Sequence, residues 1–143
     1  MAEPPTAVDT ALRALRHRDL SARELEQRLR SKGFDESERA EALETLERTG
    51  LLDDVRFAEA RARSLAARGA GDAAIRYALG LAGVERWVAE DAIQALEPEG
   101  ERAGAIAARR GHGPKTARYL RGKGFSEDVV AGVVAGSNAD ELG

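Results

Sequence analysis

Apolar residues recur at intervals of three and four along most of the chain. In the stretch 21–32, Leu25 and Leu29 lie four residues apart with polar residues between them. This spacing places both side chains on one face of an α-helix. The pattern predicts a helix with a single buried face that ends before Gly33, because glycine suits the left-handed cap that closes many helices.

Helix start signals repeat in the first part of the chain. Ser21 is followed three residues later by Glu24, which is the spacing of a capping box. Asp35 and Glu38 repeat the same spacing, and Asp53 precedes a third apolar pattern. Short polar side chains at these positions accept hydrogen bonds from the first free N–H groups of a helix. Three helix starts with the same design indicate a chain made of short helices.

The pattern then recurs downstream, aligned on Gly33, Gly83 and Gly124. These glycines are 50 and then 41 residues apart. Four residues before them, and ten residues after them, stand apolar residues: Leu29, Leu79 and Leu120, then Leu43, Ile93 and Val134. A degenerate repeat of this length is typical of helical arrays in which each unit packs against its neighbours.

We therefore predict an all-α fold of three tandem three-helix repeats that form an elongated curved array. The expected helices span 7–18, 21–32 and 35–49 in the first repeat, 53–68, 71–82 and 85–97 in the second, and 99–110, 114–123 and 126–136 in the third. The corresponding repeats cover residues 7–50, 51–97 and 98–136, and residues 137–143 are expected to form a flexible tail.

Composition agrees with a helical, intracellular protein. Of the 143 residues 43% are hydrophobic but only 4% are aromatic, so the interior consists of Leu, Ala, Val and Ile, which suits closely packed helices. The absence of cysteine excludes disulfides and thiolate metal sites and favours the cytoplasm. No apolar stretch approaches the roughly 20 residues of a membrane span, and Met1–Thr10 lacks the features of a signal peptide.

Charge changes sign in blocks along the chain, although the net charge is only −3. Residues 13–32 carry seven basic and three acidic side chains, whereas residues 33–60 carry three basic and nine acidic ones. Residues 61–82 are again basic and residues 85–101 acidic, and residues 102–124 hold seven basic side chains and no acidic one. Such blocks indicate either solvated helix faces or surfaces for a charged partner.

Motifs of catalytic or metal sites are absent. The two histidines, His17 and His112, do not stand in zinc-binding spacing, and no phosphate-binding loop of nucleotide hydrolases is present. Gly69–Gly71 offers a weak anion-binding alternative at the start of the next helix. Trp87 is expected at an interface between repeats rather than in base stacking. We predict that the protein is not an enzyme and has no catalytic, cofactor-binding or metal-binding residues.

Two basic helix faces are the candidate binding surface. In the helix 21–32, Leu25 and Leu29 define the buried side, so Arg23 and Arg30 are expected to face solvent. Equivalent basic residues lie in the second helix of the third repeat, and such ridges could contact phosphates or an acidic protein surface, although solubility alone would also explain them. The candidate residues are Arg23, Arg28, Arg30, Lys32, Lys115, Arg118, Arg121 and Lys123.

Three motifs resemble those of the RecX family. They read Ser21-x-x-Glu24-Leu25-x-x-x-Leu29-x-x-Lys32-Gly33-Phe34, Gly50-Leu51-Leu52-Asp53-Asp54-x-Arg56-Phe57-Ala58 and Lys123-Gly124-Phe125-Ser126-x-Asp128-Val129-Val130. The resemblance covers about residues 10–136. It implies a bacterial cytoplasmic protein of three helical repeats that lies in the groove of the RecA–DNA filament and inhibits the ATPase, strand-exchange and co-protease activities of RecA. Some members of the family also bind DNA directly.

The chain departs from the family at residues 71–75, which read Gly-Asp-Ala-Ala-Ile where relatives carry a basic helix start. This departure and the negative net charge favour the RecA filament as the principal partner. The chain is expected to be a monomer. Direct contact with single- or double-stranded DNA would then be secondary and confined to the first and third repeats. Two alternatives stay open, namely a DNA-binding module with helix-turn-helix-like pairs and a generic helical adaptor.

Overall fold

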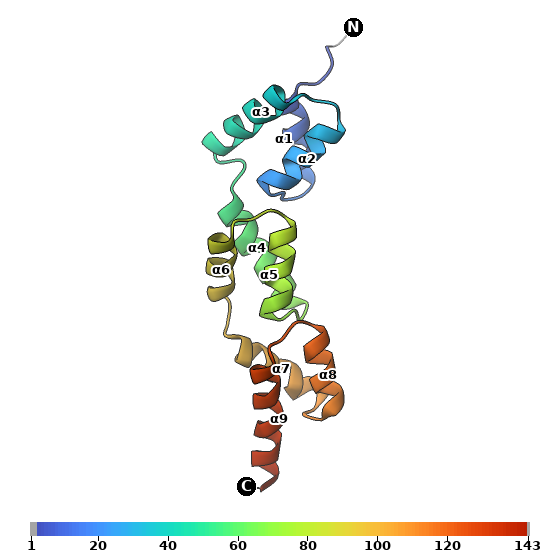
Figure 1. The fold of residues 1–143 in the computed structure, drawn as a ribbon, viewed down its shortest axis with the longest axis vertical. Helices are drawn as coiled ribbons and strands as arrows, with labels where there is room; N and C mark the ends of the chain where they lie inside the picture. The colour runs from blue at the N-terminus through green and yellow to red at the C-terminus, as the bar shows by residue number, and fades with distance from the viewer. Residues whose placement is uncertain (1–2, 143) are drawn as a thin grey trace.

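The structure, a computed structural model, describes residues 3–142, with side chains up to residue 135. Within this part of the chain it contains nine α-helices and no strand. The helices are stacked along one long axis with the two ends of the chain at opposite ends of the stack (Figure 1). The all-α array of three tandem three-helix repeats that the sequence predicts is therefore confirmed.

Each repeat consists of three consecutive helices around its own apolar core. The first contains α1 (Ala7–His17), α2 (Ala22–Ser31) and α3 (Glu36–Arg48), the second α4 (Asp54–Ala67), α5 (Asp72–Leu81) and α6 (Arg86–Gln94), and the third α7 (Glu99–Arg110), α8 (Pro114–Gly122) and α9 (Glu127–Leu142). The second helices, α2, α5 and α8, all lie on the right of the stack as drawn in Figure 1. Each contributes a fully buried leucine to its core, namely Leu29, Leu79 and Leu120.

The predicted helices agree with the observed ones to within three residues, except at the end of the chain. There α9 continues to Leu142, six residues past the predicted end at 136. The exact repeat boundaries and the flexibility of residues 137–143 stay predictions.

The predicted helix caps are present. The Ser21 hydroxyl accepts a hydrogen bond from the Glu24 N–H at 3.1 Å, and the Glu24 carboxylate accepts one from the Ser21 N–H at the same distance. Asp35 and Glu38 form the second capping box, and Asp53 caps α4. Hydrogen bonds between residues three apart depend only on local sequence, which is why these caps were predictable.

The first and second repeats are joined through the start of α2. The Ser21 hydroxyl donates a hydrogen bond to the Ala82 carbonyl at 2.5 Å, at the end of α5. The Ala22 N–H donates to the Asp54 carboxylate at 2.8 Å, at the start of α4. Ser21 is completely buried as a result. We call these contacts the first junction.

The second and third repeats are joined at the equivalent place, the start of α5. The Gly71 N–H donates to the Lys123 carbonyl at 2.8 Å, and the Ala73 N–H donates to the Gly124 carbonyl at 3.2 Å. The Asp72 N–H donates to the Glu99 carboxylate at 2.7 Å. We call these contacts the second junction.

The second junction corrects the anion-site alternative at Gly69–Gly71. The N–H groups of residues 71–73 at the start of α5 already donate to protein acceptors of the third repeat. A helix N-terminus attracts an anion only while its N–H groups are free. The helix start therefore serves the packing of the repeats, and its first three N–H groups are already used.

Trp87 also differs from its prediction. Its side chain is 59% exposed, and its ring N–H donates to the Glu85 carboxylate at 2.5 Å. The helix α6 buries a different face, formed by Val88, Ala89, Ala92 and Ile93. The prediction of a packing role between repeats was wrong because Trp87 lies outside this stripe.

Candidate functional site

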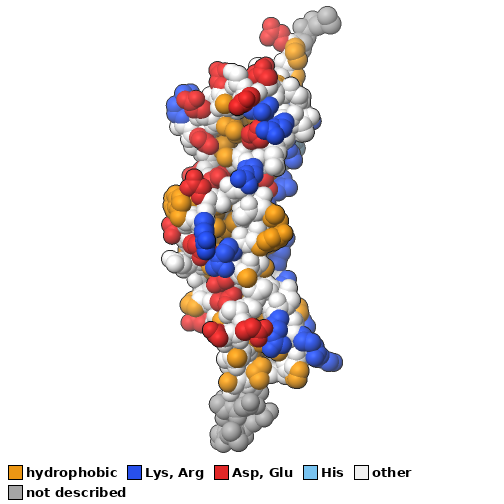
Figure 2. All heavy atoms as spheres, in the orientation of Figure 1, with side chains coloured by type: hydrophobic (Ala, Val, Ile, Leu, Met, Phe, Trp, Pro, Cys, Tyr) orange, Lys and Arg blue, Asp and Glu red, His pale blue; other side chains and the backbone are white. Residues whose placement is uncertain are grey.

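The eight candidate basic residues do not form one surface. Their side chains fall into four pairs, each in a different environment, and Figure 2 shows basic side chains interspersed with acidic ones on the described part of this face. The four environments are an open hollow, two ion pairs, the two junctions and a free helix face. Each has a different consequence for binding.

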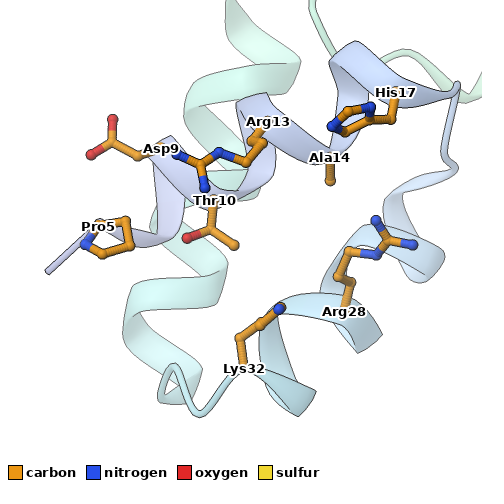
Figure 3. A pocket seen from close by; sticks show the side chains of 8 residues that line it. All are labelled: Pro5, Asp9, Thr10, Arg13, Ala14, His17, Arg28 and Lys32. Atoms are coloured by element: carbon orange, nitrogen blue, oxygen red, sulfur yellow. The ribbon is translucent and has the colours of Figure 1, made fainter.

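Arg28 and Lys32 line a hollow between α1 and α2. Arg28 lies on α2 and Lys32 is its C-cap residue, and Arg13 and His17 of α1 line the other side of the hollow (Figure 3). The hollow has a volume of about 240 Å³. Among the residues that the structure describes, none of these four side chains forms an ion pair. The hollow therefore concentrates uncompensated positive charge.

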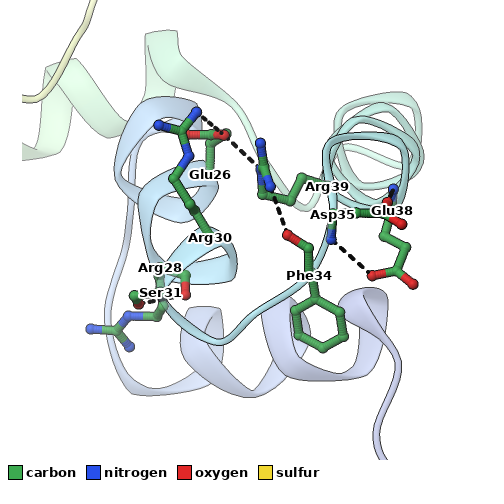
Figure 4. Close-up of polar contacts among 8 residues, drawn as sticks. All are labelled: Glu26, Arg28, Arg30, Ser31, Phe34, Asp35, Glu38 and Arg39. Carbon is green, nitrogen blue, oxygen red and sulfur yellow. Dashed lines mark hydrogen bonds and ion pairs between the residues drawn. The ribbon is translucent and has the colours of Figure 1, made fainter.

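Arg30 and Arg121 are instead paired with acidic side chains of their own repeat. The Arg30 guanidinium lies 3.1 Å from the Glu26 carboxylate, which also binds Arg39 at 2.8 Å (Figure 4). Arg121 lies 2.8 Å from Glu127 in α9. These exposed pairs contribute little stability, but they reduce the positive charge available to a partner.

Arg23 and Lys123 belong to the junctions. Arg23 is exposed, yet its side chain lies over Gly83, so close that a Cβ atom added to Gly83 would stand 2.6 Å from the Arg23 Cβ. Lys123 is half-buried, and its carbonyl accepts the hydrogen bond from Gly71. The prediction that Arg23 simply faces solvent is thereby corrected: it also packs against the end of α5.

Lys115 and Arg118 on α8 remain exposed. Within the described residues neither forms an ion pair. They are available to a partner at the far end of the molecule from the hollow, since α8 belongs to the third repeat (Figure 1).

Several basic residues of α1 and α4 were not among the candidate residues predicted from the sequence. Arg13 and His17 lie four apart on α1, as Arg28 and Lys32 do on α2, and two such pairs on neighbouring helices were the signal that could have revealed the hollow. A second hollow of about 360 Å³ is lined by Arg18, Arg61 and Arg68 together with Asp19, Phe57, Ala60 and Ser64. The middle repeat therefore presents its positive charge from α4 rather than from α5.

The second helix of the middle repeat has its basic residue neutralised. Arg76 on α5 forms an ion pair with Glu90 on α6, with Nη2 and Oε2 3.2 Å apart. The hydrogen bond from Arg76 lowers the pKa of Glu90, and the same bond raises the pKa of Arg76. The expected scarcity of positive charge at 71–75 thus extends along α5.

A cluster of ionisable groups lies at the second junction. Arg102 donates to the carbonyls of Glu97 and Ala70 at 2.9 and 2.8 Å and forms an ion pair with Asp72. Burial, and then the neighbouring Glu99 carboxylate, raise the pKa of Asp72 although Arg102 opposes the shift. All of these groups bind other protein groups, so their arrangement indicates a structural role.

Other kinds of site receive no support from the described residues. His112 lies in the loop between α7 and α8, as predicted, with Nδ1 3.4 Å from the Val133 carbonyl oxygen. Across the part of the chain with described side chains, no group of three or more His, Cys, Asp or Glu residues is arranged to hold a metal. None of the helices in that part has the length and apolar character to cross a membrane.

Comparison with known proteins gives one consistent result. Residues 7–46 match the family description "RecX, first three-helix domain", and residues 53–93 match "RecX, second three-helix domain". The chain is 36% identical over 139 residues to the regulatory protein RecX of Chromohalobacter salexigens, covering 91% of both chains. It is 34% identical over 143 residues to that of Halorhodospira halophila, covering 93% of this chain and 89% of the relative.

Solved structures show the same fold. The crystal structure of RecX from Lactobacillus salivarius superimposes with a TM-score of 0.80 at 24% identity, covering 93% of this chain and 95% of the other. A further crystal structure of a regulatory protein RecX gives a TM-score of 0.76 at 23% identity over 89% of this chain and 70% of the other. The similarity in both sequence and structure extends beyond the first two repeats.

Proposed function

Because the chain belongs to the RecX family of regulatory proteins, we propose that it is a negative regulator of the RecA recombinase. In this proposal it binds the RecA–DNA filament and inhibits the ATPase, strand-exchange and co-protease activities of RecA. It acts by binding alone, without catalysis or a cofactor, as a monomer. Its place of action is the cytoplasm, where DNA repair, recombination and the SOS response take place.

The observation that carries the proposal is the elongated stack of three repeats held together by two specific junctions. A rod of linked repeats presents the same helices in the same order along its length, which suits an extended, periodic partner such as a protein filament. A compact small-molecule enzyme would instead need one enclosed pocket with convergent polar groups.

The binding groups that we propose are the eight candidate basic side chains on α2, on α8 and at their C-caps, and they differ in how available they are. Arg28, Lys32, Lys115 and Arg118 are available for direct contact, because they are exposed and form no ion pair among the described residues. Arg30 and Arg121 would first have to exchange an acidic partner. Arg23 and Lys123 lie at the junctions, where they also contact the neighbouring repeat. The repeats that carry them span 7–50, 51–97 and 98–136.

A co-sedimentation experiment tests the proposal. RecA filaments assembled on single-stranded DNA with a non-hydrolysable ATP analogue are pelleted with the protein, and we expect the protein in the pellet at a saturating ratio to RecA. Parallel samples contain the DNA without RecA, or RecA without DNA and nucleotide. Absence from the filament pellet at micromolar protein would refute the proposal.

Direct DNA binding is the second candidate function, and the uncompensated hollow between α1 and α2 favours it. In the same experiment it would appear as pelleting or retention with DNA in the absence of RecA, and it would weaken steeply with salt. A chain retained by neither DNA nor the filament would leave only the generic helical adaptor.

A further inference from the structure

The hollow between α1 and α2 gathers basic side chains that form no ion pair among the described residues. It combines Arg13 and His17 of α1 with Arg28 and Lys32 of α2 (Figure 3). Thr10, Ala14 and Pro5 supply neutral walls, and Asp9 is the one acidic side chain that lines it. Three permanent cations thus face a single carboxylate.

The carboxylate does not neutralise the hollow. Asp9 is engaged at the start of α1, where its Oδ2 atom accepts a hydrogen bond from the Thr6 N–H at 3.3 Å as part of a capping box. No ion pair joins it to Arg13, although the two lie four residues apart on the same helix. Asp9 therefore stands at the rim as a cap, and the cations remain without a partner.

Like charges are held together here by the packing of the two helices. Leu25 and Leu29 anchor α2 in the core, and Ala11 and Ala14 anchor α1, all with at most 5% of the residue exposed. Since the buried face of each helix sets where its basic residues leave the backbone, the four residues line the same hollow whether or not a ligand is present. The backbone of the site is thus preorganised, and binding an anion requires ordering only of the exposed side chains.

We propose that this hollow is a binding site for one phosphate group of the single-stranded DNA backbone. Arginine donates two parallel N–H groups to phosphate oxygens, lysine supplies a point charge, and the histidine ring supplies a further N–H donor. The volume of about 240 Å³ falls below the roughly 300–1,000 Å³ of pockets that enclose a whole small-molecule ligand. A single phosphate on an otherwise exposed chain fits better than an enclosed nucleotide.

The second hollow extends the same path. Arg18 follows His17 directly in the sequence and lines that hollow with Arg61 of α4 and its C-cap residue Arg68. A DNA strand that places one phosphate at Arg28 and Lys32 would meet further positive charge toward the middle repeat. The proposed function treats direct contact with DNA as secondary to RecA binding. The site proposed here rests on that second function, and it would bind DNA in the absence of RecA.

Fluorescence anisotropy with a labelled 20-nucleotide oligo-dT, in potassium chloride and without RecA, tests the site. The test variant is Arg28→Gln with Lys32→Gln, and the control is Arg48→Gln with Arg86→Gln, which removes the same charge from exposed residues outside both hollows. We expect the test variant to bind about tenfold more weakly and to lose about 0.7 from the slope of log affinity against log salt, the value for one phosphate of a single strand. The control should change affinity less than about twofold.

Two further measurements distinguish a specific phosphate-binding site from nonspecific electrostatic attraction. Replacing chloride by inorganic phosphate at equal ionic strength should displace DNA from the wild-type protein but have no extra effect on the test variant. Asp9→Asn keeps a side-chain oxygen for the Thr6 N–H but removes the negative charge, so it should tighten DNA binding. Thermal unfolding followed by circular dichroism should show both double variants as stable as the wild type, because the four side chains are exposed.

Equal losses in the test and control variants would overturn the site, since only net charge would then matter. Phosphate that competes no better than chloride would overturn it as well. If phosphate competes but the test variant binds DNA normally, the assignment to DNA is wrong. If the phosphate site is refuted, the RecA proposal still stands, because the filament experiment tests it separately. If the protein binds DNA through this hollow but not the RecA filament, the RecA proposal is refuted and the phosphate site stands.

Discussion

The two junctions between repeats occupy equivalent places but are built from different groups. At the first junction a serine side chain, Ser21, spans the gap to the Ala82 carbonyl. At the second, Gly71 stands in the place of Ser21, and its backbone N–H bonds directly to the Lys123 carbonyl at 2.8 Å. A Cβ atom on Gly71 would collide with the backbone of Gly124 and Phe125. The second junction is therefore the closer of the two.

The difference affects both the capping of the helix and the hydrogen bonds between repeats. Gly71 provides no side-chain cap for α5, whereas Ser21 caps α2. In exchange, three backbone N–H groups at the start of α5 donate across the second junction, where the first junction uses one hydroxyl and one N–H. The same glycine that weakens the helix start permits backbone-to-backbone contact between repeats.

Gly124→Ala should give the largest effect, destabilising the protein by about 3 kcal/mol. Gly124 has φ +93°, and an added Cβ would lie 2.7 Å from the Ala74 Cβ and N atoms, so left-handed strain and overpacking combine. The matched control is Gly33→Ala, which has the same φ but open space around it and should cost only about 1 kcal/mol. Urea unfolding of both variants gives the comparison, and equal costs would show that the second junction is not tightly packed.

Arg102→Gln should come next, with a loss of about 2 kcal/mol. Only 10% of the Arg102 side chain is exposed, and it connects Glu97, Ala70 and Asp72. The arginine compared with it at the first junction is Arg23, whose side chain is exposed, so Arg23→Gln should cost less than about 0.5 kcal/mol. Chemical denaturation midpoints measure the pair, and a larger loss at Arg23 would reverse the order of the junctions.

Ser21→Ala should destabilise the protein by about 2 kcal/mol, because it removes a helix cap and leaves the Ala82 carbonyl without its donor. Asp35→Ala is the control, since Asp35 caps α3 and its side chain has no bond across a junction. That variant should lose about 1 kcal/mol. The excess for Ser21 is the contribution of the first junction, and a difference near zero would argue against it.

Asp72→Asn should have the smallest effect, seen as a pH dependence. A carboxyl whose pKa is raised by folding binds its proton more tightly in the folded state, so its contribution to stability is full below the unfolded pKa of about 3.9. It is lost as the pH rises through the higher folded pKa. The wild-type protein should therefore lose stability relative to Asp72→Asn as the pH rises from about 4 toward neutrality. A constant difference across that range would contradict the raised pKa of Asp72.

Local features of the fold were predictable from sequence, and contacts between repeats were not. The pairs Ser21–Glu24 and Asp35–Glu38 are three residues apart, so spacing alone identifies them. The hydrogen bond from Ser21 to Ala82 joins residues 61 positions apart, and no local pattern specifies such a pair. Gly71 looked like a helix start open to an anion because its partner, the end of α8, lies far along the chain.

The candidate site was predictable to the same extent. The sequence identified the basic residues of α2 and α8, because the buried leucines define the opposite face. It could not show which of them have acidic partners, as Arg30 and Arg121 do, since an ion pair depends on side-chain packing between helices. The four-residue spacings of Arg13–His17 and Arg28–Lys32 are visible in the sequence, but placing the two pairs on either side of one hollow requires the angle between α1 and α2.

The most direct test of the central claim is the rate of ATP hydrolysis by RecA on single-stranded DNA as the protein is titrated in. If the three joined repeats regulate the filament as we propose, the rate should fall with added protein and level off once the filament is saturated. Gly33→Ala, which leaves both junctions intact, should inhibit as the wild-type protein does. An unchanged rate of hydrolysis at a stoichiometric excess over the cognate RecA would contradict the account.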